Sequence, residues 1–265
     1  MRVDLTGRRV VITAGGSGIG RVMAERFADV GASVAVCDVD DAALQDLAAA
    51  RPGIFGAKAD VGRAEAVDAF FDAAIAHLGG LDVLVNNAGI SGPTKPVEAI
   101  TPEEWERTIG VNLNGAFFAT RRAVPLFKAQ LSGVIVNLSS TAGRMGMPNR
   151  SPYSAAKYGV RGFTDVMAIE LGEHNIRVNA ILPGVVDGPR GRRVITEQAE
   201  KRGMSFEEYL PNLLHNVSMH TMIDQEEVAD LAIFLASDYA RHISGQSIGV
   251  CGNFESYRAP RTVAA

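Results

Sequence analysis

A tyrosine and a lysine four residues apart, Tyr153 and Lys157, stand in the stretch "SPYSAAKYGV" at residues 151–160. If a helix begins here, positions i and i+4 share a face, so the ammonium of Lys157 lies beside the phenol of Tyr153. A free tyrosine has a pKa near ~10, and a neighbouring cation lowers it by favouring the phenolate. Tyr158 follows Lys157 directly and falls on another face, which predicts a packing role. The spacing therefore favours acid–base chemistry at Tyr153.

A second chemical signal is the glycine-rich stretch "VVITAGGSGIG" at 10–20, between a β-branched run and a helical pattern. Glycines let the backbone approach a ligand closely, and the following helix N-terminus offers free N–H groups to a pyrophosphate. Asp38 closes the next β-branched run, 18 residues after Gly20. A carboxylate there accepts hydrogen bonds from ribose hydroxyls and repels a 2′-phosphate, which favours NAD over NADP. An ordinary strand-end turn residue is the alternative interpretation of Asp38.

Apolar β-branched runs alternate with amphipathic stretches along the whole chain. Thr101, Pro102 and Glu104 form a helix-start signature, and one long helix is expected from there to about Leu131. The alternation predicts right-handed crossovers and a mostly parallel sheet. We expect a single Rossmann-like doubly wound α/β domain, with a seven-stranded sheet and helices on both faces. Strands are expected at 8–13, 33–38, 54–60, 81–87, 133–140, 176–182 and 246–250, and further helices at 18–30, 40–50, 63–78, 152–172 and 224–237.

One segment, 184–222, is polar, rich in arginine and glycine, and breaks the alternation. Such a segment on a rigid scaffold is often a lid over a site, so a substrate lid is expected here.

Composition excludes several classes of function. The chain has 265 residues, a net charge of −4 and no long basic run, which argues against a nucleic-acid partner. Its two cysteines, Cys37 and Cys251, give neither a disulfide framework nor metal-ligand spacing. No apolar run reaches signal-peptide length at the start or the ~20 residues of a membrane span elsewhere. We expect a cytoplasmic protein without metal or membrane partners.

Taken together, these residues resemble the short-chain dehydrogenase/reductase family from end to end. The family's T-G-x-x-x-G-x-G appears as residues 13–20, its N-N-A-G as residues 86–89 and its P-G as residues 183–184. Its Y-x-x-x-K is Tyr153 to Lys157, and its serine, thirteen residues before the tyrosine, is Ser140. Its helix asparagine is similar to Asn112 in "VNLNGAF". Departures are Ala14 for the first loop glycine, Gly188 where threonine is common, and Cys251 for an aspartate.

The resemblance implies a catalytic set of Asn112, Ser140, Tyr153 and Lys157. Ser140 is expected to hydrogen-bond the reacting oxygen, and Asn112 to fix a water that links Lys157 to solvent. Taken singly, each has an ordinary structural explanation: a partly buried aromatic, a surface charge, a backbone bridge. The cofactor contacts that the resemblance implies are Gly16, Ser17, Ile19, Asp38, Asp60, Val61, Asn87, Ala88, Gly89, Tyr153, Lys157 and the backbone of Val186.

The substrate is the least determined part of the prediction. Three arginines in the lid, Arg190, Arg192 and Arg193, could clamp a carboxylate, phosphate or sulfonate, and we hypothesise that at least one binds an anionic group. A solvated helix face is the alternative for any one of them. The other substrate-side candidates are Ser140, Met145, Met147, Asn149, Tyr153, His215, Met219 and His220.

The expected function is an NAD-dependent dehydrogenase/reductase that interconverts a secondary alcohol and its ketone, with polar, sugar-like and anionic alcohols as candidates. The resemblance implies a homotetramer, with helices 103–131 and 152–172 in the contacts. One alternative is a 3-oxoacyl-thioester reductase, which commonly uses NADP and is therefore opposed by Asp38. Sugar-nucleotide epimerases usually carry an added substrate domain. A non-catalytic dinucleotide-binding protein has no need for the four catalytic residues together.

Overall fold

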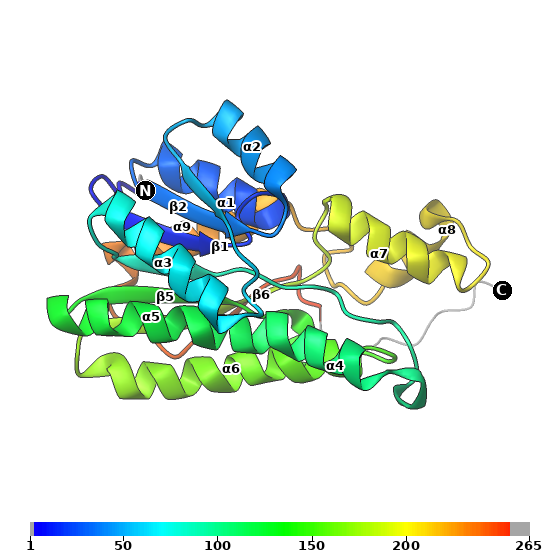
Figure 1. Cartoon of the computed structure of the whole chain (residues 1–265). Helices are drawn as coiled ribbons and strands as arrows, with labels where there is room; N and C mark the ends of the chain where they lie inside the picture. Colours follow the sequence, from blue (N-terminus) through cyan, green and yellow to red (C-terminus); the bar gives the residue numbers. More distant parts are fainter. Residues whose placement is uncertain (1–2, 255–265) are drawn as a thin grey trace.

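The computed structural model describes residues 3–254, and its centre is a seven-stranded sheet (Figure 1). The strands are β1 (Arg9–Thr13), β2 (Ser33–Asp38), β3 (Phe55–Lys58), β4 (Val83–Asn86), β5 (Gly133–Leu138), β6 (Ile176–Pro183) and β7 (Ser247–Val250). Their order in the sheet is β3-β2-β1-β4-β5-β6-β7. Every neighbouring pair of strands runs parallel, so the sheet is wholly parallel rather than mostly so. This is the doubly wound architecture expected from the sequence.

Helices cover both faces of the sheet (Figure 1). Those on the two faces are α1 (Gly18–Asp29), α2 (Asp41–Ala50), α3 (Ala64–Leu78), α5 (Gly115–Gln130), α6 (Ser151–Gly172) and α9 (Gln225–Ala236). The helices α4 (Pro102–Ile109), α7 (Pro189–Glu200) and α8 (Phe206–Leu214) contribute to neither of the two sheet cores. Successive residues of β1 point to opposite cores: Val10 and Ile12 pack with α1, α2 and α9, while Val11 packs with α3, α5 and α6. Two buried faces explain why the strands read as continuous apolar runs.

The strand order reverses between β1 and β4, which pair in parallel with Val10 opposite Val83. In open α/β sheets, ligands bind at the carboxyl ends of the strands at such a reversal point. The glycine-rich loop after β1 and the N-N-A-G segment after β4 are therefore neighbours. Their contact is direct, since Thr13 Oγ1 accepts hydrogen bonds from Asn87 N at 3.1 Å and Ala88 N at 3.0 Å.

The helix expected to run unbroken from Thr101 to Leu131 is instead two helices, α4 and α5, joined by a π-helical turn at Gly110–Asn114. The predicted start is confirmed, because the Thr101 and Glu104 side chains form a reciprocal capping box. Asn112 lies within the turn, and its Nδ2 donates both to Thr108 O at 2.9 Å and to Ile90 O, on an earlier segment, at 3.0 Å. Such turns inside helices are frequent at functional sites.

Residues 184–222 break the alternation, but with more regular structure than the sequence led us to expect. They contain α7 and α8, which extend to one side of the main body (Figure 1). Pro189 opens α7, and a Ser205–Glu208 capping box opens α8. The two helices share a small core of their own, built on Ile195, Ala199 and Tyr209. Within residues 3–254, no helix combines the length and apolarity that a bilayer crossing requires.

Candidate active site

Tyr153 and Lys157 lie on one face at the start of α6, as their spacing predicts. Lys157 Nζ is 5.8 Å from the centre of the Tyr153 ring. Lys157 is only 3% exposed, and its ammonium donates to the carbonyl oxygen of Leu138, at the end of β5, at 2.7 Å. Tyr153 is half-buried, whereas Tyr158 lies on the exposed side of the helix. A buried cation is thus held beside a partly accessible phenol.

The charges around Tyr153 favour its phenolate. Burial by itself raises the pKa of the phenol, but the positive charges of Lys157, Arg190 and Arg150 and a hydrogen bond with Ser140 outweigh it, so the pKa lies below its ordinary value. Burial lowers the pKa of Lys157 to about 8, against the opposing pull of Tyr153. The phenol is therefore prepared to release a proton more readily than a free tyrosine.

Two adjacent serines after β5 have separate tasks. Ser140 caps a short turn by accepting from Ala142 N at 3.1 Å, and its hydroxyl also meets Tyr153. Ser139 donates to the carbonyl oxygen of Lys157 at 2.8 Å, which ties α6 to the sheet. Ser139 therefore has a structural contact, while Ser140 lies beside the phenol.

Asn112 presents a buried acceptor to the same place. Its Oδ1 has no hydrogen-bond partner within residues 3–254, while its Nδ2 is fully occupied. A Cβ built on Gly89 would lie 2.6 Å from that Oδ1 and 3.4 Å from Lys157 Nζ. The amide oxygen and the ammonium therefore flank one glycine, an arrangement that suits a small polar group bridging them.

The glycine loop meets the requirements of a pyrophosphate site. Ser17 precedes α1 without capping it through its side chain, and the first turn of α1 holds no acidic residue, so its N–H groups stay available to an anion. A Cβ on Gly20 would lie 2.0 Å from Ala14 O, so only glycine fits there. Ala14, where the family has glycine, itself adopts a left-handed φ of 53°. The loop thus keeps the glycine-like conformation at the strain cost of one alanine.

Asp38 lies beside the glycine loop and contacts its backbone. It is 7% exposed, and its Oδ2 accepts from Gly16 N at 3.0 Å while its Oδ1 accepts from Asp40 N at 3.2 Å. Each carboxylate oxygen has lone pairs left for a ribose hydroxyl. Together with the uncapped α1, this arrangement fits a dinucleotide.

The remaining predicted cofactor contacts lie around the same edge. Asp60 accepts from Arg107 at 2.8 Å and from Gly62 N at 2.9 Å; burial raises its pKa, but these partners lower it below the ordinary value overall. Val186 forms a single parallel bridge with Ile223.

Gln225, which sequence reasoning missed, fills the space beside Gly188. A Cβ on Gly188 would lie 2.8 Å from Gln225 Nε2, and one on Gly18 would lie 3.8 Å from Gln225 Oε1. The amide therefore stands between the glycine loop and the segment after β6. Only the fold reveals this, because Gln225 opens α9, more than 200 residues after the loop.

The three lid arginines are placed differently. Arg190 Nη1 donates to Gly89 O at 2.8 Å, and its charge acts on Tyr153 and Lys157. Arg192 pairs with Asp187 through two contacts of 2.6 and 2.7 Å. Arg193 Nε stands 3.8 Å from a carboxylate oxygen of Glu197. The arrangement brings Arg190 to the site and engages the other two with lid carboxylates.

The other predicted substrate residues differ in burial and in their surroundings. Met147 is half-buried, and Asn149 is exposed with a left-handed φ of 62°. His215 and His220 stack on each other, with ring centres 6.1 Å apart. Arg150, which the sequence reasoning did not select, is buried against Tyr153, with its guanidinium carbon 4.7 Å from the ring centre.

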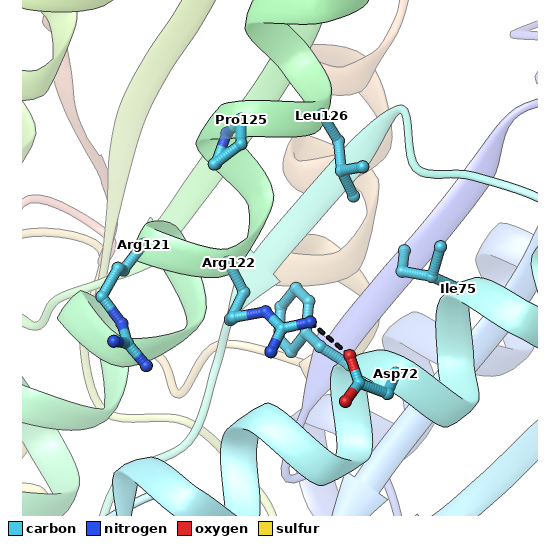
Figure 2. Close-up of a pocket in the computed structure, with 7 residues that line it drawn as sticks. Asp72, Ile75, Arg121, Arg122, Pro125 and Leu126 are labelled. Atoms are coloured by element: carbon cyan, nitrogen blue, oxygen red, sulfur yellow. Dashed lines mark hydrogen bonds and ion pairs between the residues drawn. The ribbon is translucent and has the colours of Figure 1, made fainter.

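A hollow of about 360 Å³ lies elsewhere, between α3 and α5 (Figure 2). Its arginines are paired with carboxylates. Arg121 pairs with Asp68, and Arg122 pairs with both Asp68 and Asp72. The contact between Arg122 and Asp72 is the dashed line in Figure 2. The hollow therefore lacks the unpaired polar groups that mark the Tyr153 region.

Known proteins resemble this chain over nearly its whole length. The model of the family described as enoyl-(acyl carrier protein) reductase matches residues 13–254. The probable galactose dehydrogenase GalD of Rhizobium meliloti (strain 1021) is 38% identical over 255 residues, covering 94% of this chain and 95% of that protein. The 3-oxoacyl-[acyl-carrier-protein] reductase FabG of Thermotoga maritima is 35% identical over 253 residues, covering 94% of this chain and 98% of that protein.

Solved structures superpose equally well. NAD⁺-bound xylitol dehydrogenase has a TM-score of 0.88 at 30% identity, with 93% of this chain and 98% of that chain covered. A variant of actinorhodin polyketide ketoreductase with NADPH has a TM-score of 0.90 at 30% identity, with 94% of this chain and 98% of that chain covered. Relatives of this fold thus bind either dinucleotide.

Proposed function

The chain belongs to the short-chain dehydrogenase/reductase family, and on that premise we propose that it is an NAD(H)-dependent oxidoreductase that interconverts a secondary alcohol and its ketone. The single observation that carries the proposal is the buried Lys157 ammonium on the same helix face as the Tyr153 phenol. Ser140 and Asn112 complete the proposed catalytic set.

In the oxidation direction, Ser140 donates a hydrogen bond to the substrate oxygen and holds it beside Tyr153. Tyr153, as phenolate, accepts the hydroxyl proton, and Lys157 stabilises the phenolate by charge. A bound nicotinamide would supply the acceptor for the hydride of the carbinol carbon. The Asn112 amide oxygen, buried beside Lys157, offers an acceptor through which a water can return the proton to solvent. In the reduction direction, Tyr153 is the proton donor.

The preference for NAD over NADP is supported by Asp38. Its carboxylate is buried against the glycine loop, where the adenosine ribose would lie, and a 2′-phosphate there would meet a like charge. The loop's own side chains bring no compensating cation, since Ser17 is the polar residue at the N-cap of α1.

A homotetramer is supported by exposed apolar residues on the helices that the resemblance points to. Trp105 on α4, Phe117 on α5, and Val166 and Ile169 on α6 are exposed, the last to 81%. Large apolar side chains on neighbouring helices suit contacts between copies. The unpaired cysteines Cys37 and Cys251 suit a reducing, cytoplasmic compartment.

A 3-oxoacyl-thioester reductase is the second candidate, favoured by the family description and by the relative from Thermotoga maritima. The two candidates differ in cofactor and substrate. The test is an assay of NAD⁺ and NADP⁺ reduction with secondary alcohols, polyols, sugars and hydroxy acids, alongside NADH and NADPH oxidation with a 3-oxoacyl thioester. NAD-linked turnover of an alcohol supports the first candidate; NADPH-linked turnover of the thioester overturns it.

A further inference from the structure

Arg150 is a buried cation that helps to lower the pKa of the Tyr153 phenol but holds no substrate group in the proposed mechanism. It immediately precedes α6 and is 8% exposed. Its Nη2 donates to Ser91 O at 3.0 Å, but its Nε is buried without a hydrogen-bond partner anywhere in residues 3–254. Its Nη1 makes no hydrogen bond in that range either, yet it is not among the buried unpartnered atoms, so it keeps contact with solvent.

No carboxylate within the described range forms an ion pair with Arg150. Glu197 is the one carboxylate whose charge acts on it, in addition to the phenol of Tyr153, and Glu197 is exposed and stands beside Arg193. Burial accordingly lowers the pKa of Arg150. A buried charge without a carboxylate partner destabilises the fold, so a partner that pairs with it in the working state is expected.

The cations nearby add to this excess of positive charge. The guanidinium carbon of Arg150 lies 4.7 Å from the centre of the Tyr153 ring, and Lys157 Nζ lies 5.8 Å from the same point. Arg190 is near enough for its charge to act on Arg150, Tyr153 and Lys157. Lys157 already serves the phenol, because both belong to one helix face. Arg150 stands over the face of the ring and has donors left for another acceptor.

We propose that Arg150, with the charge of Arg190 nearby, binds the carboxylate of the substrate, so that the alcohol is a short hydroxy acid and the ketone an oxo acid. This inference rests on the proposed function. The guanidinium is in contact with the ring whose hydroxyl exchanges the proton, so the carboxylate stands within a few bonds of the carbinol carbon. Nη1 is the donor that meets it, and a guanidinium gives a planar, charge-assisted contact that carboxylates match.

The test measures turnover of 2- and 3-hydroxy carboxylates against their methyl esters, which keep the carbinol and lose the charge. Wild type, Arg150→Met and Arg150→Lys are compared by kcat and KM. Arg144→Met is the matched control, because Arg144 also donates through Nη2 to one backbone carbonyl, Ser247 O at 2.8 Å, from the exposed side of the same segment. Thermal unfolding of each variant identifies any that fail to fold.

Wild type is expected to prefer the acid over its ester. Arg150→Met is expected to lose about 10- to 100-fold of that preference, the worth of a charge-assisted hydrogen bond, through a rise in KM of the acid that the ester does not share. Because Arg150 also helps to lower the pKa of the Tyr153 phenol, any fall in kcat is expected to be the same for acid and ester. Arg150→Lys retains part of the preference, and Arg144→Met all of it. An unchanged ratio of KM for acid and ester in Arg150→Met, or a wild type that prefers the ester, overturns the proposal and leaves the proposed dehydrogenase activity intact.

Absence of turnover with every alcohol and either cofactor contradicts the proposed function instead. In that case acetate is titrated into the protein in saturating NAD⁺, and calorimetry tests whether the proposed anion site binds a carboxylate, independently of turnover. Binding by wild type that is lost in Arg150→Met supports it, and equal or absent binding in both overturns it.

Discussion

The two arginine-bearing helix starts of this molecule, that of α6 and that of α7, differ in what surrounds their charges. Before α6, Arg150 is buried over the Tyr153 ring and has no carboxylate partner within residues 3–254. On α7, Arg192 is exposed and held by both oxygens of Asp187, and Arg193 stands near Glu197. The density of arginine is higher on α7, but the unsatisfied charge is at α6. Burial without a partner, rather than the number of cations, marks the place where chemistry is expected.

Among the variants that test the contrast between the two helix starts, Tyr153→Phe at the start of α6 is expected to have the largest effect on turnover. The variant keeps the aromatic ring and removes the only group placed to exchange the proton, so kcat is expected to fall by about 10²- to 10⁴-fold. NAD⁺ binding, measured by calorimetry, should stay near wild type. Tyr158→Phe, one residue beyond Lys157 and exposed, is the matched control and should keep full activity. Full activity in Tyr153→Phe would reject the mechanism.

A smaller effect, on cofactor binding, is expected from replacing one of two carboxylates, of which one is buried and the other is exposed and paired with an arginine. Asp38 is buried against the loop, and Asp187 is exposed and paired with Arg192. Asp38→Ala should raise KM for NAD⁺ by about tenfold or more, as lost hydrogen bonds to a charged acceptor predict, and should raise the ratio of NADP⁺ to NAD⁺ turnover. Asp187→Ala should leave that ratio unchanged. An unaltered cofactor ratio in Asp38→Ala would remove the basis for NAD preference.

The smallest effect on stability and on KM is expected from breaking the exposed ion pair between Arg192 and Asp187. Arg192→Met removes a surface ion pair with Asp187, and such pairs contribute less than about 1 kcal/mol to the free energy of unfolding. Thermal unfolding and KM for the best substrate should both stay close to wild type. A large rise in KM would show that Arg192, rather than Arg150, supplies the anion contact, and would reverse the contrast between the two helix starts.

Much of the fold could be predicted from the sequence, because the signals are local. Continuous apolar runs mark strands buried on both faces, and Thr101 with Glu104 marks the start of α4. The break in the helix after Ile109 could not be predicted in this way. It accompanies a contact of the Asn112 amide with Ile90 O, which lies on a segment 22 residues earlier in the chain. A polar side chain within a helical pattern does not reveal such a partner.

The residues of the candidate site also fall into those that local spacing predicts and those that depend on contacts distant in sequence. The spacing of Tyr153 and Lys157 is enough to place them together, since one helix positions both. Arg150 escaped notice because its neighbours in sequence, Asn149 and Ser151, say nothing of burial; its contact with Ser91 crosses from another segment. The lid arginines attracted attention by their number alone, and their pairing with Asp187 and Glu197 is visible only in three dimensions.

The central claim, that nearby cations lower the pKa of the Tyr153 phenol, can be tested directly by spectroscopic titration. The ultraviolet difference spectrum of wild type minus Tyr153→Phe, followed against pH, reports the phenolate of this one tyrosine. A midpoint below the ordinary value of ~10 is predicted, because Lys157, Arg190 and Arg150 outweigh burial. In Lys157→Met the midpoint should move up, since burial then meets less opposition. A midpoint at or above ~10 in wild type, or one that Lys157→Met does not raise, would contradict the account.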